Sequence, residues 1–556
     1  MKHVLRGIGL SAAALLTACS HTPSAQPPVA QAPVRVQVLA INDFHGNLMP
    51  PAAFRMNDPA DPSKVLQIPV GGSKALATAV KTLRAREPNH VFVAAGDLIG
   101  ASPLLSALFH DEPSLESLSL MGLHISAVGN HEFDKGHVEL LRRIRGGCHP
   151  TEGCKGSNPY KGISFEYLAA STIDVQSGKT LLPAYSVRHF EGVPVAFIGL
   201  TLKGTPDLVL PSAIEGLRFD DEVQTVNRLV PELKAQGIEA IVVLIHEGGY
   251  PTGGHNECPG ISGPIVDLTQ RFDPAVDVVV SGHTHRAYTC RIAGKLVTSG
   301  DKYGSIVTEI ELQLDRKTRD VQTSQAKNHL VRLDQYAPDA DQTRLLDTYL
   351  QQAKPLMERE IGRLDQEIRT GAGDRAGGWP MGHLVADAQL AAVRHLGVEL
   401  ALTNTGGVRA PLPRHADGLI RFADLYTAQP FGNTLVMMTL SGAELQKLIE
   451  SQWRESGRYD PLQPSTGLSY TWDARRPLGA RIVPGSLMLN GRPVTPEREI
   501  RLVVNNFVAE GGDGFPGFRA GRQRQNAMLD VEALETYIQA QRTVRAPALD
   551  RIRRVD

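Results

Sequence analysis

The chain has 556 residues and a formal net charge of −1, with 42% hydrophobic and 21% charged residues. This length exceeds what one hydrophobic core usually serves, so we expect two domains. The balanced charge gives no reason to expect a nucleic-acid polymer as a partner, although a small anionic ligand is compatible with it. The 53 glycines and 37 prolines favour a turn-rich architecture over a helical bundle.

The first nineteen residues have the features of an export signal. Lys2 and Arg6 precede the apolar stretch 7–16, which is too short to span a bilayer. Residues 16–19 read LTAC and resemble the bacterial lipobox, in which the cysteine is lipidated. We therefore expect an exported, membrane-anchored lipoprotein attached through Cys19, facing the periplasm or the cell surface. An ordinary secretory signal is the alternative, and the Pro/Ala-rich segment 20–33 is expected to be a flexible tether.

Four cysteines remain after Cys19 is set aside, and an even number in an exported chain favours disulfides. Three pairings exist; we prefer Cys148 with Cys154 and Cys258 with Cys290. The rival interpretation is a Cys/His zinc site around CHPTEGC at 148–154, which an oxidising compartment makes less favourable.

Five apolar runs in the first half of the chain stop at polar residues. They occupy 36–41, 91–95, 124–128, 240–245 and 276–281. Such runs are typical of strands buried on both faces, and the stretches 71–88 and 223–237 between them have helical periodicity. The alternation predicts an α/β domain, whose sites lie beyond the carboxyl ends of the strands. The polar residues delivered there are Asp43, His45, Asp97, Asn130, His131, Asp134, His246, His283 and His285.

Seven of these residues combine oxygen and imidazole donors without a thiolate. Taken singly, each is usually a turn residue or a hydrogen-bonded polar group. Together they suit divalent ions such as Zn²⁺, Mn²⁺, Co²⁺, Fe²⁺ or Mg²⁺. Seven ligands exceed one tetrahedral site and suit two ions roughly 3.5–4 Å apart with a bridging carboxylate. The candidate ligands are Asp43, His45, Asp97, Asn130, His246, His283 and His285.

The character of the chain changes after residue 335. Residues 336–360 show helical apolar spacing, for example at Leu346 and Tyr349, and Asp341 is a plausible start. We interpret this segment as a helix that links the domain at 34–335 to a second domain at 361–556. An ordinary surface helix within one domain is the alternative.

The motifs, taken together, resemble a known family. DFHG, GD, GNHEFD and GHTH, spread over positions 42–285, are similar to those of metallophosphoesterases. TNTGGVR at 403–409, PFGN at 430–433 and GGDGF at 511–515 resemble the second domain of the 5′-nucleotidase and UDP-sugar hydrolase family. The resemblance implies an N-terminal α/β/β/α sandwich followed by a C-terminal α/β nucleotide-binding domain.

The resemblance also implies a role for each candidate residue of the first domain. One ion would be held by Asp43, His45, Asp97 and His285. The other would be held by Asp97, Asn130, His246 and His283, so that Asp97 bridges. His131 and Asp134 match the catalytic pair: a protonated His131, charged and oriented by Asp134, would stabilise the transition state and assist the departing oxygen.

In the second domain, the resemblance implies a nucleotide pocket. Arg375 and Arg409 match arginines that clamp phosphate, which guanidinium groups suit. Phe431 and Phe507 match two rings that sandwich the base, whereas Asn404 matches a base contact and Asp513 a ribose contact. Two positions depart from the family pattern: Gly371 stands where some relatives have arginine, and His383 where they have asparagine.

We therefore expect an exported two-metal hydrolase of nucleoside 5′-monophosphates, acting in nucleotide salvage, with nucleotide sugars or other nucleotides as further candidate substrates. Three alternatives stay open: a 2′,3′-cyclic-nucleotide phosphodiesterase, a protein phosphatase, and a surface binding or adhesion protein on the same scaffold. The sequence does not indicate the oligomeric state.

Overall fold

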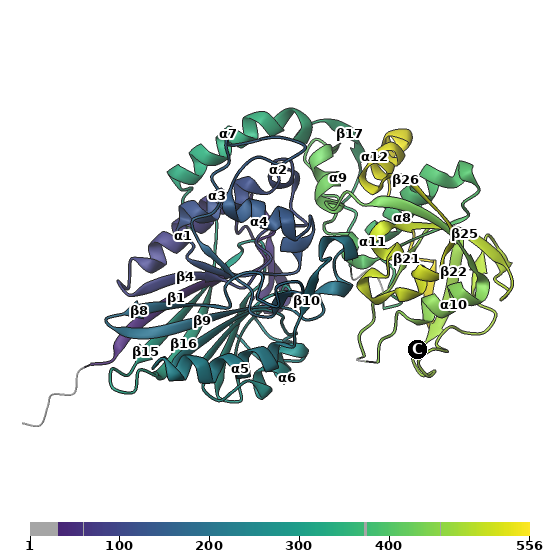
Figure 1. Ribbon diagram of the computed structural model, residues 1–556. Coiled ribbons are helices and arrows are strands. Elements are labelled where there is room, and N and C mark those ends of the chain that lie inside the picture. The colour runs from purple at the N-terminus through teal and green to yellow at the C-terminus, as the bar shows by residue number, and fades with distance from the viewer. Residues whose placement is uncertain (1–31, 59–60, 372–374, 456, 556) are drawn as a thin grey trace, which may run out of the picture.

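The computed structural model describes residues 32–58, 61–371, 375–455 and 457–555. The chain forms two lobes, the first running from purple to teal and the second from green to yellow (Figure 1). The predicted signal, Cys19 and most of the tether lie outside the described residues. Within the described ranges, every helix is too short or too polar to cross a bilayer.

The first sheet of the first domain carries three of the predicted ligand-bearing strands. Its central strands β1, β4, β5 and β6 are parallel, whereas β15 and β16 pair antiparallel at one edge. Across the sheet the order is β16 (Val321–Leu330), β15 (Ile306–Leu314), β1 (Val34–Ile41), β4 (His90–Ala94), β5 (Ile125–Ala127) and β6 (Glu166–Leu168).

The second sheet carries the other two ligand-bearing strands. Its four inner strands are parallel and its two edge strands antiparallel. The order is β13 (Ala287–Ile292), β14 (Lys295–Gly300), β12 (Val278–Ser281), β11 (Ala240–His246), β9 (Val193–Thr201) and β8 (Tyr185–Phe190). Strands β9, β11 and β12 are buried along their whole length, which explains their continuous apolar sequences.

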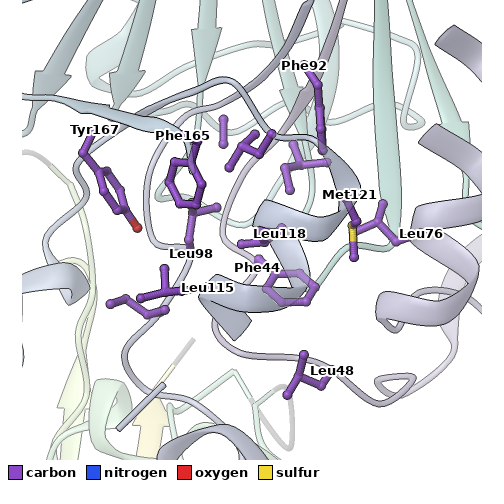
Figure 2. Packing of buried hydrophobic residues seen from close by; sticks show 14 of the residues in the cluster. Phe44, Leu48, Leu76, Phe92, Leu98, Leu115, Leu118, Met121, Phe165 and Tyr167 are labelled. Carbon is purple, nitrogen blue, oxygen red and sulfur yellow. The ribbon is translucent and has the colours of Figure 1, made fainter. Parts of the chain in front are cut away.

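The two sheets pack face to face, and helices cover their outer faces. Side chains such as Val93, Phe197 and Val242 fill the space between the sheets. Helices α1 (Ser73–Arg84) and α3 (Glu112–Met121) cover the first sheet, where residues such as Phe44, Phe92 and Leu118 form a common cluster (Figure 2). Helices α5 (Glu222–Ala235) and α6 (Pro264–Arg271) cover the second sheet. The predicted α/β/β/α sandwich is confirmed.

Helix α7 (Ala340–Met357) lies within the segment expected to link the domains and runs over the first lobe toward the second (Figure 1). Leu346, Tyr349 and Ala353 are buried in the core of the first domain. The helix begins one residue after Asp339, whose side chain accepts hydrogen bonds from the backbone N–H groups of Asp341 and Gln342. The expectation that Asp341 starts the helix is therefore wrong: Asp339 is the capping residue.

The second domain is built on a five-stranded sheet with helices on both faces. Its order is β21 (Gln463–Pro464), β18 (Leu400–Thr403), β25 (Glu499–Asn505), β20 (Thr434–Ser441) and β26 (Arg522–Leu529). Helices α8 (Pro380–Val393) and α12 (Asp530–Gln541) pack on one face and α10 (Gly442–Glu450) on the other. The predicted C-terminal α/β domain is confirmed.

Smaller elements complete both domains. The second domain has two further short sheets. The order of the first is β19 (Leu419–Arg421), β17 (Glu360–Leu364) and β27 (Thr543–Val544). The order of the other is β24 (Arg492–Pro493), β23 (Met488–Leu489), β22 (Leu468–Asp473) and β28 (Ile552–Val555). The first domain adds the strand pairs β2 (Phe54–Asp58) with β3 (Asp61–Ile68) and β7 (Thr172–Asp174) with β10 (Leu217–Phe219). The remaining helices are α2 (Leu104–Ala107), α4 (His137–Arg145), α9 (Phe422–Ala428) and α11 (Asn506–Ala509).

Two disulfides crosslink segments of the first domain. Cys148 pairs with Cys154 in the loop after α4, and Cys258 pairs with Cys290 of β13. This is the preferred pairing, and it rules out the cysteines as ligands of the rival Cys/His zinc site.

The cap of α7 gives a test of this local structure. Asp339→Ala should lower the free energy of unfolding of the first domain by about 1 kcal/mol, because two backbone N–H groups lose their acceptor. Urea unfolding followed by far-UV circular dichroism measures this change. The tryptophans Trp379, Trp453 and Trp472 all lie in the second domain, so their fluorescence reports that domain separately. Asp341→Ala is the matched control, and an equal loss there would contradict the assignment of the cap.

Candidate active site

All seven candidate metal ligands lie at the carboxyl ends of strands, where the two sheets meet. The structure brings the ligand atoms of Asp43, His45 and His285 within 4.8 Å of one another, and likewise those of Asp97, His246 and His283. Asp97 contacts both groups: its Oδ2 atom lies 3.6 Å from His45 Nε2 and 2.9 Å from His246 Nε2. Asp97 therefore occupies the bridging position between the two groups.

The backbone at these ligands is unusual. Asp43, His45, Asp97, His283 and His285 all have φ between 46° and 66°. This left-handed region is uncommon for residues other than glycine and costs on the order of 1–3 kcal/mol each. The surrounding fold tolerates that cost at five of the seven ligands, which concentrates backbone strain at the cluster. Strain of this kind is typical of functional sites.

Close packing around Asp97 explains the glycine of the GNHEFD motif. A Cβ atom at Gly129 would lie 2.1 Å from Asp97 Oδ1 and 2.5 Å from the Asp97 nitrogen. Only glycine lets the chain after β5 approach the carboxylate this closely. The approach also allows the backbone N–H of His131 to donate to Asp97 Oδ1 at 2.9 Å.

Glu132, inside the GNHEFD motif, and Asn42, directly before DFHG, support the candidate ligands, and the sequence predicts no role for either. The buried Glu132 carboxylate accepts hydrogen bonds from the backbone N–H groups of Asp97, Leu98 and Gly129 at 3.0, 2.7 and 2.6 Å. Asn42 donates to Asp43 Oδ2 at 2.7 Å and accepts from the Gly300 N–H at 2.7 Å. Only the tertiary arrangement shows that these side chains hold the ligand loops.

The donor set fits divalent cations. The Oδ1 atom of Asn130 is buried and has no hydrogen-bond partner within the described ranges, as a metal ligand would. Burial lowers the pKa of His45, His283 and His285, that of His283 to about 4, so these imidazoles are neutral and able to coordinate. At His246 burial acts in the same direction, but Asp97 outweighs it and raises the pKa to about 10. Metal binding would release that proton.

His131 and Asp134 form the expected pair. The Nδ1 atom of His131 lies 3.0 and 2.9 Å from the two carboxylate oxygens of Asp134. The N–H of Ala101 donates to the same carboxylate at 3.1 Å and holds it in place. Burial alone would lower the pKa of His131, but the Asp134 and Asp97 carboxylates outweigh burial and raise it above its usual value. The geometry favours a protonated imidazole.

A cavity of about 1240 Å³ lies between the domains and is lined by both. The first domain contributes Asp97, Asn130, His131, Asp134, His283 and His285. The second contributes Asn404, Arg409, Phe431, Phe507 and Asp513. The structure therefore brings five of the six predicted substrate-binding residues to the metal ligands.

Arg409 and Phe431 reach across to the catalytic pair. The Phe431 ring stacks on the His131 ring at 5.8 Å between centroids, and Lys135 Nζ donates to the Phe431 carbonyl at 3.2 Å. The guanidinium of Arg409 lies 5.9 Å from the centre of the Phe431 ring. Its Nε and Nη2 atoms are buried with no hydrogen-bond partner in the described part of the chain. These two buried nitrogens make Arg409 a strong candidate for binding an anion.

Hydrogen bonds hold the polar side chains with which the second domain lines the cavity. Asn404 Nδ2 donates to Asp513 Oδ2 at 2.6 Å, and Asn505 Nδ2 donates to Asn404 Oδ1 at 3.0 Å. The Phe507 ring packs so closely on Gly512 that a Cβ atom there would lie 2.4 Å from it. Asn505 lies outside the sequence motifs of this domain, and only its hydrogen bond to Asn404 reveals its supporting role.

Some residues differ from expectation in their position. Arg375 is exposed and is not among the residues that line the cavity, so the structure does not bring it to the site. His383 is buried in α8, where its Nδ1 atom lies 3.2 Å from the Ala548 carbonyl, and it does not line the cavity either. Conversely, Arg458 and Asp460 do line it. No local motif distinguishes these two residues in the sequence.

Comparison with known proteins agrees with this geometry. Residues 36–287 match the family model of calcineurin-like phosphoesterases, and residues 360–520 match that of the 5′-nucleotidase C-terminal domain. The 5′-nucleotidase precursor of Thermus thermophilus has a crystal structure that superposes with a TM-score of 0.76 at 27% identity, covering 94% of this chain and 99% of that one.

Two curated relatives match most of this chain. Endonuclease YhcR of Bacillus subtilis is 32% identical over 509 residues, which cover 91% of this chain but 40% of that protein. Cell wall protein Lmo0130 of Listeria monocytogenes is 29% identical over 544 residues, which cover 92% of this chain and 67% of that protein. The chain thus spans less than half of the first relative, and the activity of that whole protein does not transfer.

Both halves of the chain match the two characteristic domains in the same order, and the ligand cluster faces the cavity that the second domain completes. The chain therefore belongs to the two-domain 5′-nucleotidase family and is a metal-dependent phosphoester hydrolase.

Proposed function

We propose that this enzyme hydrolyses nucleoside 5′-monophosphates to nucleoside and phosphate with two divalent ions. The observation that carries the proposal is Arg409, which lines the cavity with the candidate metal ligands and whose Nε and Nη2 atoms are buried with no hydrogen-bond partner among the described residues. An anionic group bound there would lie between Arg409 and the cations. The aromatic rings on the second-domain wall favour an anion attached to a planar base.

The ions would be held as the resemblance implies. Asp43, His45 and His285 would hold one, and Asn130, His246 and His283 the other, with Asp97 shared between them. When bound, such ions supply an activated water and neutralise phosphate charge. Their identity among Zn²⁺, Mn²⁺, Co²⁺, Fe²⁺ and Mg²⁺ is not fixed by this donor set.

The protein's own groups would position the substrate and stabilise developing charge. Arg409 would donate hydrogen bonds to phosphate oxygens in a fork that matches their spacing. Phe431 and Phe507 would stack on the base, Asn404 would contact its edge, and Asp513 would accept from the ribose. His131, held protonated by Asp134, would donate toward the departing ester oxygen.

We also propose an extracytoplasmic location, with a lipid anchor at Cys19 and a role in nucleotide salvage. The lipobox-like residues 16–19 and the two disulfides support this, because disulfides persist in oxidising compartments. The name of the Listeria relative, a cell wall protein, is consistent with it.

Removal of the bridging carboxylate tests the two-ion centre. Asp97→Ala should leave fewer than two ions per polypeptide and abolish hydrolysis, because both groups of ligands lose a shared oxygen. Metal content after saturation and desalting, measured by mass spectrometry, provides the readout. His189→Ala, which changes an exposed histidine, is the control. Two ions retained in Asp97→Ala would reject the bridging role.

The catalytic pair predicts a change in pH dependence. Asp134 raises the pKa of His131, and the protonated form is lost as pH rises through that pKa. Asp134→Asn should therefore move the alkaline limb of the kcat profile to lower pH, with metal content unchanged. His131→Ala should lower kcat by roughly 10²–10⁴-fold. The exposed carboxylate variant Asp267→Asn serves as control, and an unmoved alkaline limb in Asp134→Asn would count against the pair.

A substrate panel tests the proposed function directly. The candidates are AMP, ATP, UDP-glucose, 2′,3′-cyclic AMP, glycerol 3-phosphate and single-stranded DNA, and AMP should give the highest kcat/KM. Phe431→Ala should raise KM for AMP by roughly 5–150-fold, the equivalent of about 1–3 kcal/mol of stacking, and spare the ring-free glycerol 3-phosphate. Phe54→Ala, in the β2–β3 pair, is the control. Preference for the cyclic nucleotide or DNA would replace the proposed substrate, and equal losses on both monoesters would reject stacking.

A further inference from the structure

A second cluster of side chains that could hold a metal ion shares no residue with the seven candidate ligands. His110 follows α2, and His149 and Glu152 belong to the loop that the Cys148–Cys154 disulfide closes. One ligand atom from each of the three lies within 4.8 Å of the others. All three residues line the interdomain cavity, on its first-domain side.

His110 has a donor atom without a partner. Its Nε2 atom is buried and makes no hydrogen bond within the described ranges. The nearest carboxylate oxygen, Glu152 Oε2, lies 3.9 Å away, which is too far for a hydrogen bond. Two atoms at this distance can share one ion, since each bond to zinc measures about 2.0–2.2 Å. Burial also lowers the pKa of His110, which keeps the imidazole neutral as coordination requires.

His149 also presents a ring nitrogen that can act as a lone-pair donor. Its Nδ1 atom accepts a hydrogen bond of 3.2 Å from the backbone N–H of Glu152. The His149 and His110 rings stack at 4.6 Å between centroids with 12° between their planes. An ion bound at this nitrogen would replace two long contacts, 3.2 Å to the Glu152 N–H and 3.3 Å to the Thr151 hydroxyl.

The loop around His149 is constrained before any ion binds. The disulfide closes residues 148–154, and the N–H of Gly153 donates to the His149 carbonyl at 3.0 Å. Two of the three ligands therefore sit on one small ring of backbone, which lowers the entropy lost on binding. His110 itself has φ of 58°, a strained conformation that aims it at this loop.

Several charged residues surround the three candidate ligands, and ion pairs already engage them. Arg143 pairs with Asp111 at 3.7 Å and with Glu139 at 3.0 Å, which engages both carboxylates. Lys155 Nζ contacts the Glu152 carboxylate and occupies the position of a cation. The ammonium group is thus a competitor that an ion must displace.

We propose that His110, His149 and Glu152 form a separate binding site for a borderline divalent cation such as Zn²⁺. Two imidazoles and one carboxylate are a donor set that zinc favours, and three protein ligands leave a coordination position open toward the cavity. The site shares no residue with the Asp97 cluster, so it stands whether or not the proposed substrate is right.

Metal counting on the full-length protein tests the site. Wild type saturated with Zn²⁺ should hold one ion more per polypeptide than His149→Ala or Glu152→Gln, as measured by mass spectrometry after equilibrium dialysis. The affinity of the extra ion should fall by more than roughly a hundredfold, since even residues that only orient a ligand cost 10–100-fold. Glu152→Gln changes a partly exposed side chain, and its circular dichroism spectrum checks the fold. His189→Ala controls for surface histidines.

Lys155→Ala should change the Zn²⁺ affinity of this site in the opposite direction. Removal of the competing ammonium should tighten Zn²⁺ binding at this site by a few-fold, whereas loss of any true ligand weakens it. Equal zinc stoichiometry and affinity in wild type, His149→Ala and Glu152→Gln would overturn the proposal, as would weaker binding in Lys155→Ala. Because the readout is a difference between variants that all keep Asp97, a failure of the two-ion proposal would leave this comparison valid.

Discussion

The site depends on one carboxylate held between two sheets. Asp97 follows strand β4 of the first sheet, yet its nearest imidazole partner, His246, ends strand β11 of the second. Asp97 Oδ2 and His246 Nε2 lie 2.9 Å apart. A buried carboxylate is tolerated only when neighbouring groups or cations compensate its charge. The sandwich therefore places strand ends from both sheets around Asp97, and the N–H of His131 completes its surroundings. The candidate metal ligands therefore come together only if the two sheets pack in this way.

The two domains contribute different kinds of groups to the site. The first domain supplies a strained and closely packed ligand cluster that leaves little freedom to its residues. The second domain lines the cavity with the groups that we propose recognise the substrate: a guanidinium, two rings and the Asn404–Asp513 pair. The stacking of Phe431 on His131 joins the two sets directly. On the proposed assignment, changes in the second-domain wall would alter the substrate without changing the candidate metal ligands.

Much of the first domain and its site could be predicted from sequence because buried parallel strands read as continuous apolar runs that end in ligands. The pairing of ligands into two groups, in contrast, came from family resemblance. Residues such as Glu132 and Asn505 could not be assigned from sequence, because their roles depend on hydrogen bonds to segments that fold next to them. Arg458 and Asp460 have no local pattern at all. The sequence predicts the start of α7 two residues too late, because Asp339 and Asp341 both suit a helix start and only the backbone contacts decide between them.

The packing of α7 has a mechanical consequence. The helix is anchored in the core of the first domain down to Ala353 and ends at Met357, whereas β17 of the second domain begins at Glu360. Arg359 already belongs to the second domain, since its carbonyl accepts from the Phe422 N–H and its guanidinium pairs with Glu535. The segment that joins the two domains therefore consists of little more than Glu358. Any swivel of one lobe against the other must be absorbed by the torsion angles of this short pivot, so the approach of Arg409 to the cations would follow an arc rather than a free path.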